Sequence, residues 1–323
     1  MITFRANRPL QAAPVSPLTP RSVLVIGAEN SLAYYLAHAL RDGGTAVAVQ
    51  AVSPETILAA RRSFNVIEQP LADLRFAEQL QQLQPDVILY APPEPGHGRN
   101  NWRPLEVFNR VVSRVVSVCD ATRRFAPDAR LLLLSSADVY GECGSPAQEE
   151  QPLMPATLTG RYYHMAEQIA QDFSATHQLK LIICRTSSVY GPAVRNNPVH
   201  DLIMNLLGPQ GTDNHVPLDP HALRDLLHAG DFVEAVKLLL AQTACGVYNV
   251  GSGTTHSLEE LNVQLCDLLE LPRLFHRAEP QPHLPQRQWL ATTRLEQLGF
   301  KPGVPLLEGL RGYIGWWSGI QAA

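Results

Sequence analysis

The residues with the clearest chemical meaning form a short turn after the apolar run Val23–Ile26. Gly27 ends this run, and Ser31–Asp42 has the spacing of apolar residues that is typical of a helix. A strand, a glycine turn and a helix N-terminus bind nucleotide phosphates, because the first amides of the helix point at the anion. Turns that hold a dinucleotide carry three glycines, whereas Asn30 and Ala33 stand at the second and third of these positions. The turn therefore predicts phosphate binding by an altered loop.

Each substitution in this turn has a predicted consequence. Asparagine tolerates a positive φ better than other non-glycine residues, so Asn30 is expected to replace the second glycine. Ser31 is expected to cap the helix, and Leu32 belongs to the same cofactor-binding segment. Glu29 opposes binding unless it points to solvent, because a carboxylate about 4 Å from a phosphate costs roughly 4 kcal/mol at an effective dielectric constant near 20. Two interpretations stay open: the turn binds a dinucleotide, or the fold has kept the turn and lost the ligand.

The end of the next apolar run, Ala46–Gln50, lacks the acidic residue that holds the ribose hydroxyls in many dinucleotide-binding proteins. Gln50 and Ser53 are the side chains there that could form hydrogen bonds to a ribose. Arg61 and Arg62 follow, and they favour the additional phosphate of NADP or simply belong to an exposed helix. The sequence predicts a site for NAD or NADP and leaves the choice between them open.

The wider pattern of the chain must position this turn. From Arg21 on, short apolar runs alternate with amphipathic segments of helix length. The predicted strands are Val23–Ile26, Ala46–Gln50, Asp86–Tyr90, Leu131–Ser135 and Leu179–Cys184, and the predicted helices are Ser31–Asp42, Leu74–Leu83, Leu105–Arg124 and Tyr162–His177. Continuous apolar strands separated by helices favour an α/β fold, with a doubly wound parallel sheet that helices cover on both faces.

The chain is predicted to have three parts. Residues 1–20 contain four prolines and no apolar core of a secretory signal, so they are interpreted as a flexible arm. Residues 21–185 form the dinucleotide-binding, Rossmann-type domain. After about Ser187 proline and glycine become more frequent, and residues 186–323 are interpreted as a smaller substrate lobe that is partly interleaved with the first domain.

The composition narrows the classes of partner. A net charge of −4 gives no reason to expect nucleic acid or an anionic membrane, and no apolar stretch is long enough to span a bilayer. The five cysteines are widely spaced, without a CxxC motif or a Cys/His cluster. They predict neither a metal site nor a disulfide framework, and a reducing cytoplasm fits them best.

The middle of the chain carries a resemblance to a known family. The segment LLLLSSADVYGE, residues 131–142, is similar to the strand and Ser-Ser-x-x-Val-Tyr-Gly turn of the extended short-chain dehydrogenases/reductases, such as nucleotide-sugar epimerases and dehydratases. Further matching segments follow in the order of that family: DVILYAPP (86–93), RTSSVYGP (185–192), RDLLHAGDFVEAV (224–236) and VYNVGSG (247–253). The resemblance spans about residues 22 to 300, and it implies a nucleotide-sugar-like ligand beside NAD or NADP.

The resemblance also implies cofactor contacts for individual residues. Asp73 and Leu74 match a pair that contacts adenine. Ala91 and Pro92 lie in the small-residue turn beside the cofactor. Ser188 lies in the segment that joins the nicotinamide and sugar sites.

Two residues are candidates for contact with the substrate. Arg224 matches an arginine that contacts the diphosphate of a nucleotide sugar, because a guanidinium fork suits phosphate oxygens. Its alternative is an ion pair with Asp225 or Asp231. His97 lies in a glycine-flanked loop over the expected nicotinamide position and could act on a substrate from there. The alternative is an ordinary solvated loop histidine.

The catalytic pair of this family is absent from the chain. In the family, a tyrosine and a lysine four residues later share one helix face, and the lysine lowers the pKa of the tyrosine so that the phenolate takes a proton during hydride transfer. Aligned on the Ala-Glu-Gln of residues 166–168, the tyrosine position holds Thr159 and the lysine position holds Tyr163. No Tyr-x-x-x-Lys occurs anywhere in the sequence. Ser136, at the third catalytic position, remains as a hydrogen-bond donor for a substrate carbonyl.

A replacement for this pair would be Tyr163 together with His164, because an imidazole has a pKa near neutrality. Neighbouring residues of a helix point about 100° apart, which opposes a joint role. The alternative is that Tyr162 and Tyr163 are packing residues, together with Met165.

A homodimer is implied by the same resemblance, since relatives pair through the helices that correspond to Leu105–Arg124 and Tyr162–His177. The first of these holds more valines than one buried face requires: Val111, Val112, Val115, Val116 and Val118.

Three functions fit these observations. The first is an NAD(P)-binding member of the family with an altered or very slow reaction. The second is a non-catalytic pseudoenzyme that acts as a binding or complex subunit. The third is an enzyme of non-redox chemistry, an isomerisation or cyclisation, in a pocket shaped by Ser136, Tyr163 and His97. The missing Tyr/Lys pair weighs against ordinary oxidoreduction.

Overall fold

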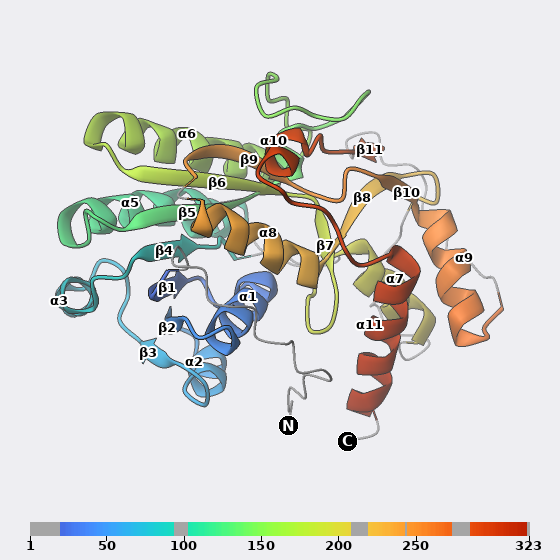
Figure 1. Cartoon of the computed structure of the whole chain (residues 1–323), viewed down its shortest axis with the longest axis horizontal. Coiled ribbons are helices and arrows are strands. Elements are labelled where there is room, and N and C mark those ends of the chain that lie inside the picture. Colours follow the sequence, from blue (N-terminus) through green and yellow to red (C-terminus); the bar gives the residue numbers. More distant parts are fainter. Residues whose placement is uncertain (1–19, 94–102, 208–218, 243, 273–284, 322–323) are drawn as a thin grey trace.

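A seven-stranded parallel sheet forms the centre of the computed structural model, which describes residues 20–93, 103–207, 219–242, 244–272 and 285–321 (Figure 1). Its strands are β1 (Ser22–Ile26), β2 (Ala46–Gln50), β3 (Asn65–Ile67), β4 (Val87–Tyr90), β5 (Arg130–Ser136), β6 (Lys180–Thr186) and β9 (Gly246–Val250). They lie in the order β3-β2-β1-β4-β5-β6-β9, and all pairs are parallel. This is the doubly wound sheet that the sequence predicted.

Helices cover both faces of this sheet. They are α1 (Ser31–Asp42), α2 (Pro54–Ala60), α3 (Leu74–Leu83), α4 (Pro104–Phe108), α5 (Arg114–Phe125), α6 (Leu158–His177), α8 (Ala229–Ala241) and α10 (Thr293–Gln297). A smaller lobe contains β7 (Ser188–Tyr190), β8 (Leu223–His228), β10 (Thr255–Ser257), β11 (Arg287–Gln288), α7 (Pro198–Leu207), α9 (Leu258–Leu269) and α11 (Leu306–Gln321). The chain returns from this lobe to the large sheet through α8 and β9 (Figure 1).

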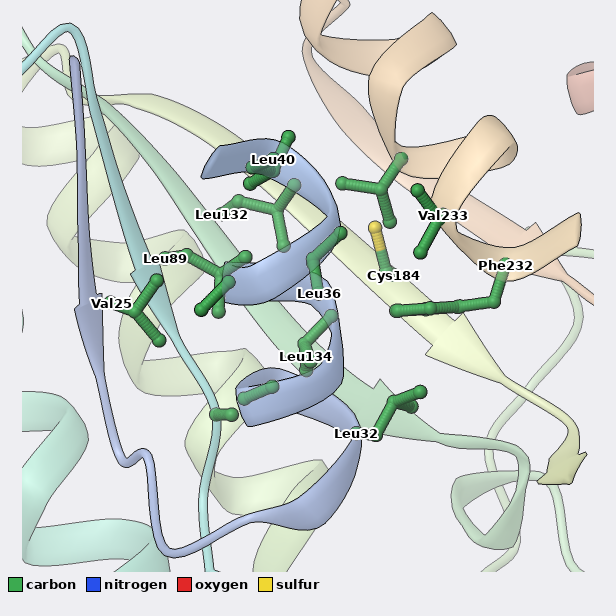
Figure 2. Close-up of a cluster of buried hydrophobic side chains, with 14 of the residues drawn as sticks. Val25, Leu32, Leu36, Leu40, Leu89, Leu132, Leu134, Cys184, Phe232 and Val233 are labelled. Atoms are coloured by element: carbon green, nitrogen blue, oxygen red, sulfur yellow. The ribbon is translucent and has the colours of Figure 1, made fainter. Parts of the chain in front are cut away.

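Alternate residues of the central strands face opposite sides of the sheet. Val23 and Val25 pack on the side of α1 and α8, whereas Leu24 and Ile26 pack on the side of α3, α5 and α6. Figure 2 shows the first of these layers, in which α1 lies between the strands and α8. Its labelled side chains are Val25, Leu32, Leu36, Leu40, Leu89, Leu132, Leu134, Cys184, Phe232 and Val233. Burial on both faces explains the uninterrupted apolar runs in the sequence.

A buried polar network joins α6 to the carboxyl ends of β5, β6 and β9. Arg185 and Glu167 form an ion pair at 2.7 Å, and their side chains are only 4% and 1% exposed. The Ser135 hydroxyl donates to Glu167 (2.5 Å), and Arg185 donates to the Tyr140 hydroxyl (2.8 Å), which in turn donates to Asn249 Oδ1 (2.7 Å). Burial alone lowers the pKa of Arg185, but the hydrogen bonds and charge of Glu167 more than offset this and raise it. Each buried charge is thus compensated by several partners.

Two predicted elements differ from the structure in their bounds. The predicted helix 105–124 is interrupted by a π-helical turn, η1 (Asn109–Ser113), between α4 and α5. Helix α6 begins at Leu158, before the predicted start at Tyr162, because Thr157 Oγ1 accepts from Gly160 N (3.0 Å) and caps it. The short elements α2 and β3 have no counterpart among the predictions, since seven and three residues carry too little periodicity.

The valines of α5 and η1 do not leave a second apolar face. Val111, Val112, Val115 and Val118 are all buried within this chain, and Val116 alone is exposed, by 40%. The prediction that these valines exceed one buried face is therefore wrong. Four of the five valines pack on the buried side of the helix.

Protonation of His200, on α7, should destabilise the smaller lobe in acid. Its Nδ1 lies 2.7 Å from the hydroxyl of Tyr313 on α11, and this hydroxyl donates to the Val194 carbonyl (3.2 Å). Burial, helped by the charge of Arg195, lowers the pKa of His200 from 6.5 to about 4. Between these two values the unfolded chain takes up a proton that folded His200 does not, so the free energy of unfolding falls as the pH falls.

We therefore expect urea unfolding to show a loss of stability between about pH 6.5 and about pH 4 that is smaller in a His200→Gln variant. The exposed His177→Gln variant serves as the control and should keep the wild-type pH dependence. Identical pH profiles for wild type and His200→Gln would contradict this assignment.

Candidate functional site

The turn after β1 depends on a close contact between two strand ends. Gly27 has φ +93°, in the left-handed region that glycine adopts without strain, and a Cβ there would lie 2.0 Å from the Ala91 carbonyl oxygen. Ala91 N also donates to the Ile26 carbonyl (3.0 Å). The structure therefore brings Gly27 together with Ala91 and Pro92, three residues that the sequence assigned to one site.

Asn30 does not replace a glycine by adopting a positive φ, and that prediction is wrong. Its φ is −75°, and it is the N-cap of α1, where its Oδ1 accepts from Ala33 N (3.0 Å). Its Nδ2 donates to the Pro92 carbonyl (2.9 Å), and the residue is 5% exposed. The side chain thus fastens the start of α1 to the segment after β4.

Ser31 does not cap α1 as predicted, and the cofactor contacts of Ser31 and Leu32 stay predictions. Ser31 is the first residue of α1 and not its cap, and its Oγ accepts from Arg195 N (3.0 Å), which belongs to the loop after β7. Leu32 is 6% exposed and points into the layer between the sheet and α8 (Figure 2). Its side chain therefore belongs to the core, and a phosphate could reach only its backbone.

The sequence predicts that Glu29 opposes phosphate binding unless its side chain points to solvent. The side chain does not point to solvent. Its Oε1 accepts from Val52 N (3.4 Å), two residues after the end of β2. Its Oε2 is buried and has no hydrogen-bond partner among the described residues. The carboxylate therefore lies at the carboxyl end of β2, where the sequence has no acidic residue of its own.

Gln50 is the predicted ribose-binding residue that remains available. It is fully buried, its Nε2 donates to the Gln69 carbonyl (3.0 Å), and its Oε1 has no partner among the described residues. Ser53 instead caps α2, and Arg61 is paired with Glu68 at 2.5 Å. One of the two arginines that favoured NADP, Arg61, is thus held by a carboxylate of this chain, whereas Arg62 is exposed.

Asp73 and Leu74 lie at the start of α3. Asp73 is the N-cap, and its Oδ1 accepts from Arg75 N (2.8 Å), while Leu74 is 80% exposed. The residue that contacts Gln50 is Gln69, which the sequence did not single out. Contact of Asp73 and Leu74 with adenine stays a prediction.

Ser136 ends β5 and begins the short 3-10 turn η2 (Ala137–Val139). Its Oγ accepts from Asp138 N (3.1 Å). The first turn of α6 packs against this segment so closely that a Cβ on Gly160 would lie 2.5 Å from the Asp138 carbonyl oxygen. Half-buried Thr159 precedes this glycine, so Ser136 and Thr159 flank one contact at the carboxyl end of β5.

Tyr163 lies in the core on the α5 and α6 side of the sheet and is 8% exposed. Tyr162 is partly buried beside the same core and makes an edge-to-face contact with Phe108. These environments favour the packing interpretation of both tyrosines. Two of the three lysines of the chain hold other groups: Lys180 donates to the Asp128 carbonyl, and Lys237 pairs with Glu234.

Arg224, on β8, makes its contacts with neutral carbonyl groups. Its guanidinium donates to the carbonyls of Leu223 (2.9 Å), Gln286 (3.2 Å) and Pro285 (3.0 Å). Burial lowers the pKa of Arg224, against the opposing charges of Asp138, Glu142 and Asp219. No carboxylate among the described residues forms an ion pair with it.

The alternative ion pair of Arg224 with Asp225 or Asp231 is therefore wrong. Asp225 accepts from the backbone of Ser252 (2.8 Å) and Gly253 (3.2 Å). Asp231 accepts from the backbone amides of residues 303 and 304. Both aspartates hold loops of the chain, and the charge of Arg224 remains without a counterion in the described structure.

Ser188 begins β7, which pairs in parallel with β8, and it is half-buried. Its neighbour Ser187 has a buried Oγ without a partner among the described residues. His97 lies outside the described residues, as do residues 1–19 of the predicted arm 1–20. In the described ranges, no group of three His, Cys, Asp or Glu side chains is arranged to hold a metal, and no helix is long and apolar enough to cross a membrane.

The carboxyl ends of β1, β2 and β3 fit the adenosine half of a dinucleotide. Glu29 Oε2, Gln50 Oε1 and Gln69 Oε1 are buried oxygens without partners in the described part of the chain. Buried polar atoms normally have partners, so three orphaned acceptors in one region suit a ligand that brings hydroxyl or amino donors. Sequence reasoning missed Gln69 and the direction of Glu29, for which neither residue type nor spacing carries a signal.

The chain is similar to known proteins in sequence and in fold. Residues 23–251 match the NAD dependent epimerase/dehydratase family. The UDP-glucose 4-epimerase of Azospirillum brasilense is 28% identical and is matched over 94% of this chain and 93% of its own length. The UDP-glucose 4-epimerase of Thermus thermophilus, solved with NAD, is 22% identical with a TM-score of 0.79 over 92% of this chain and 99% of that one.

A dTDP-glucose 4,6-dehydratase from Streptomyces venezuelae, a double mutant solved with NAD bound, has a TM-score of 0.81 at 21% identity, over 93% of this chain and 98% of its own. The family match covers the large sheet from β1 to β9 together with the interleaved part of the smaller lobe. This chain belongs to the NAD-dependent epimerase/dehydratase family of extended short-chain dehydrogenases/reductases.

Proposed function

We propose that this protein binds NAD(H) at the carboxyl ends of β1–β3 and a nucleotide-sugar-like ligand between Ser136 and Arg224, with atypical or no redox catalysis. The observation that carries the proposal is a contrast within one site. The cofactor side has a glycine turn and unpartnered acceptors. On α6, however, no Tyr-x-x-x-Lys occurs, and alignment on residues 166–168 assigns Thr159 and Tyr163 to the positions of the family's tyrosine and lysine.

The residues present suit binding better than proton transfer. When bound, NAD accepts a hydride from a substrate carbon and can return it. The protein must also take a proton from the substrate hydroxyl, which needs a group with a pKa near the working pH. Thr159 offers only an aliphatic hydroxyl, and Tyr163 lies in the core. Ser136 keeps a hydroxyl that can donate a hydrogen bond to a carbonyl oxygen.

Arg224 supports a diphosphate as the second ligand. Its guanidinium is bound by three carbonyls and faces no carboxylate within ion-pair distance in the described structure. A desolvated cation without a counterion attracts an anion, and a fork of N–H donors matches phosphate oxygens. The relatives include proteins solved with UDP-glucose, a ligand with such a diphosphate.

Calorimetric and thermal-shift titrations with NAD⁺, NADH, NADP⁺ and NADPH test the cofactor half of the proposal. A ligand at a hundredfold excess over its Kd adds about 2.7 kcal/mol of stability, so binding should raise Tm by a few degrees. No shift with any of the four would exclude the redox role and leave a pseudoenzyme or a cofactor-free pocket.

Titration of the NAD-loaded protein with UDP-glucose and dTDP-glucose tests the second half. We expect binding that an Arg224→Ala variant weakens, with turnover absent or far below that of the relatives. A double variant, Thr159→Tyr with Tyr163→Lys, restores the family pair and should raise turnover if the pocket still orients a nucleotide sugar. Ordinary turnover by the wild type, lost in Ser136→Ala and Tyr163→Phe, would instead show that the protein uses an alternative catalytic set.

The same titrations and turnover measurements distinguish two alternative functions. A non-catalytic subunit would bind NAD without turnover of any sugar nucleotide. An enzyme of non-redox chemistry would convert a substrate without a change in nicotinamide absorbance, and Ser136, Tyr163 and His97 are its candidate residues. The burial of Tyr163 weighs against the second of these.

We also propose a homodimer formed through α5 and α6, by analogy with relatives. Val116 on α5 and Met165 on α6 are each 40% exposed, and Met165 and Ile169 line a shallow hollow on α6. Sedimentation should show a dimer that Val116→Asp together with Met165→Asp dissociates. A strictly monomeric wild type would contradict this assembly. We also propose a reducing compartment such as the cytoplasm, because all five cysteines are thiols and four of them are buried.

A further inference from the structure

The carboxylate of Glu29 occupies an unusual place for a residue of the phosphate-binding turn. It belongs to the loop between β1 and α1, yet its Oε1 accepts from Val52 N (3.4 Å) beyond the end of β2. Its Oε2 is buried without a partner among the described residues. The side chain therefore spans from one strand end to the next and leaves one oxygen available.

The surroundings of this oxygen are rich in acceptors and poor in donors. Gln50 and Gln69 are joined by a hydrogen bond from Gln50 Nε2 to the Gln69 carbonyl (3.0 Å), and the Oε1 atoms of both are buried and unpartnered. Two of the nearby donors are already used, since Ser53 caps α2 and Arg61 pairs with Glu68, and Arg62 is exposed. Such a site binds groups that bring hydrogens, and it disfavours anions.

Because β1, β2 and β3 are adjacent and parallel, these three acceptors lie at one edge of the sheet. The sequence after β2, Gln50-Ala51-Val52-Ser53, contains no carboxylate. Glu29 brings one to the same place from the neighbouring loop.

We propose that Glu29 binds the 2′-hydroxyl of the adenosine ribose and thereby makes the site specific for NAD over NADP; this assignment rests on the proposed binding of NAD(H). A carboxylate accepts a hydrogen bond from a ribose hydroxyl, and charge makes this bond stronger than a neutral one. The same carboxylate repels the 2′-phosphate of NADP. The Ala33 amide at the start of α1 already donates to Asn30. Asn30 therefore holds the turn, while Glu29 is the residue proposed to bind the ribose.

The test compares NAD⁺, 2′-deoxy-NAD⁺ and NADP⁺ by calorimetry on the purified full chain, with no measurement of activity. For the wild type, we expect 2′-deoxy-NAD⁺ to bind about tenfold more weakly than NAD⁺, and NADP⁺ about a hundredfold more weakly. In Glu29→Ala, NAD⁺ and 2′-deoxy-NAD⁺ should bind with equal affinity, and the gap to NADP⁺ should narrow by about tenfold or more. Glu29→Gln keeps an acceptor without the charge, so it should retain part of the 2′-hydroxyl preference while admitting NADP⁺.

Glu55→Gln is the matched control, because it removes one exposed carboxylate from the first turn of α2, close to the same strand end. It should leave all three affinities unchanged. The melting temperature of each variant shows whether it is folded, and the wild-type comparison of NAD⁺ with 2′-deoxy-NAD⁺ needs no variant.

The outcomes separate the two proposals. Binding of NAD⁺ with no preference over 2′-deoxy-NAD⁺, or a Glu29→Ala variant that still excludes NADP⁺ as the wild type does, overturns the role of Glu29 and leaves cofactor binding intact. A wild type that binds none of the dinucleotides overturns the proposed function and this inference with it.

Discussion

Replacing Glu167 with alanine should lower the free energy of unfolding by about 3–5 kcal/mol, because it leaves the buried guanidinium of Arg185 without a compensating charge. The pair is 2.7 Å apart, and both side chains are nearly inaccessible to water. The substitution also removes the acceptor of the Ser135 hydroxyl. Urea unfolding monitored by circular dichroism measures the loss.

The chain offers a matched control in a second Arg–Glu pair on the surface. Arg61 and Glu68 lie 2.5 Å apart, but their side chains are 62% and 36% exposed. Water and salt replace such a contact readily, so Glu68→Ala should cost only about 0–1 kcal/mol. Equal losses in the two variants would show that burial is not what makes the Glu167 pair important.

A Gly27→Ala variant should lose about 3 kcal/mol of stability and bind no dinucleotide. Two effects add there. The residue has φ +93°, which alanine adopts only with strain, and the new Cβ would meet the Ala91 carbonyl oxygen at 2.0 Å. Relief of this overlap must separate the ends of β1 and β4, on which the cofactor turn is built. Thermal unfolding and calorimetry with NAD⁺ measure the two losses.

A Gly44→Ala variant distinguishes the effect of backbone strain from the effect of the steric overlap with Ala91. Gly44 has nearly the same φ, +91°, but a Cβ there would have no atom within 4 Å. Gly44→Ala should therefore cost only the backbone strain of about 1–2 kcal/mol and leave dinucleotide binding unchanged. If both glycine variants lost the same stability, close packing of the two strand ends would be refuted as the cause.

The fold was predictable because its signals are local and repeated. The five apolar runs carry residues for both faces of a buried parallel strand, and their order with the helices leaves few topologies. The bounds of α1, β2 and α3 agree with the predictions residue by residue. Elements as short as β3 have no such periodicity, and the π-helical turn η1 depends on packing that no local pattern encodes.

The candidate site was only partly predictable, because several of its residues act through contacts over long separations in the chain. Asn30 was assigned by residue type to a backbone conformation, but its side chain finds the Pro92 carbonyl and caps α1. Glu29 was weighed only against a phosphate, whereas its partner is Val52 on the next strand end. The alternative ion pair of Arg224 with Asp225 or Asp231 does not form, because both aspartates already accept hydrogen bonds from backbone amides.

Asn30 also bears on when the turn becomes ordered. A glycine at this position would leave the loop free to sample several conformations until a nucleotide selected one. Asn30 instead fixes the loop to α1 and to the segment after β4 through two side-chain hydrogen bonds. The loop therefore loses its conformational entropy when the protein folds, and not when a nucleotide binds. The Ala33 amide should accordingly exchange its hydrogen slowly whether or not a nucleotide is present.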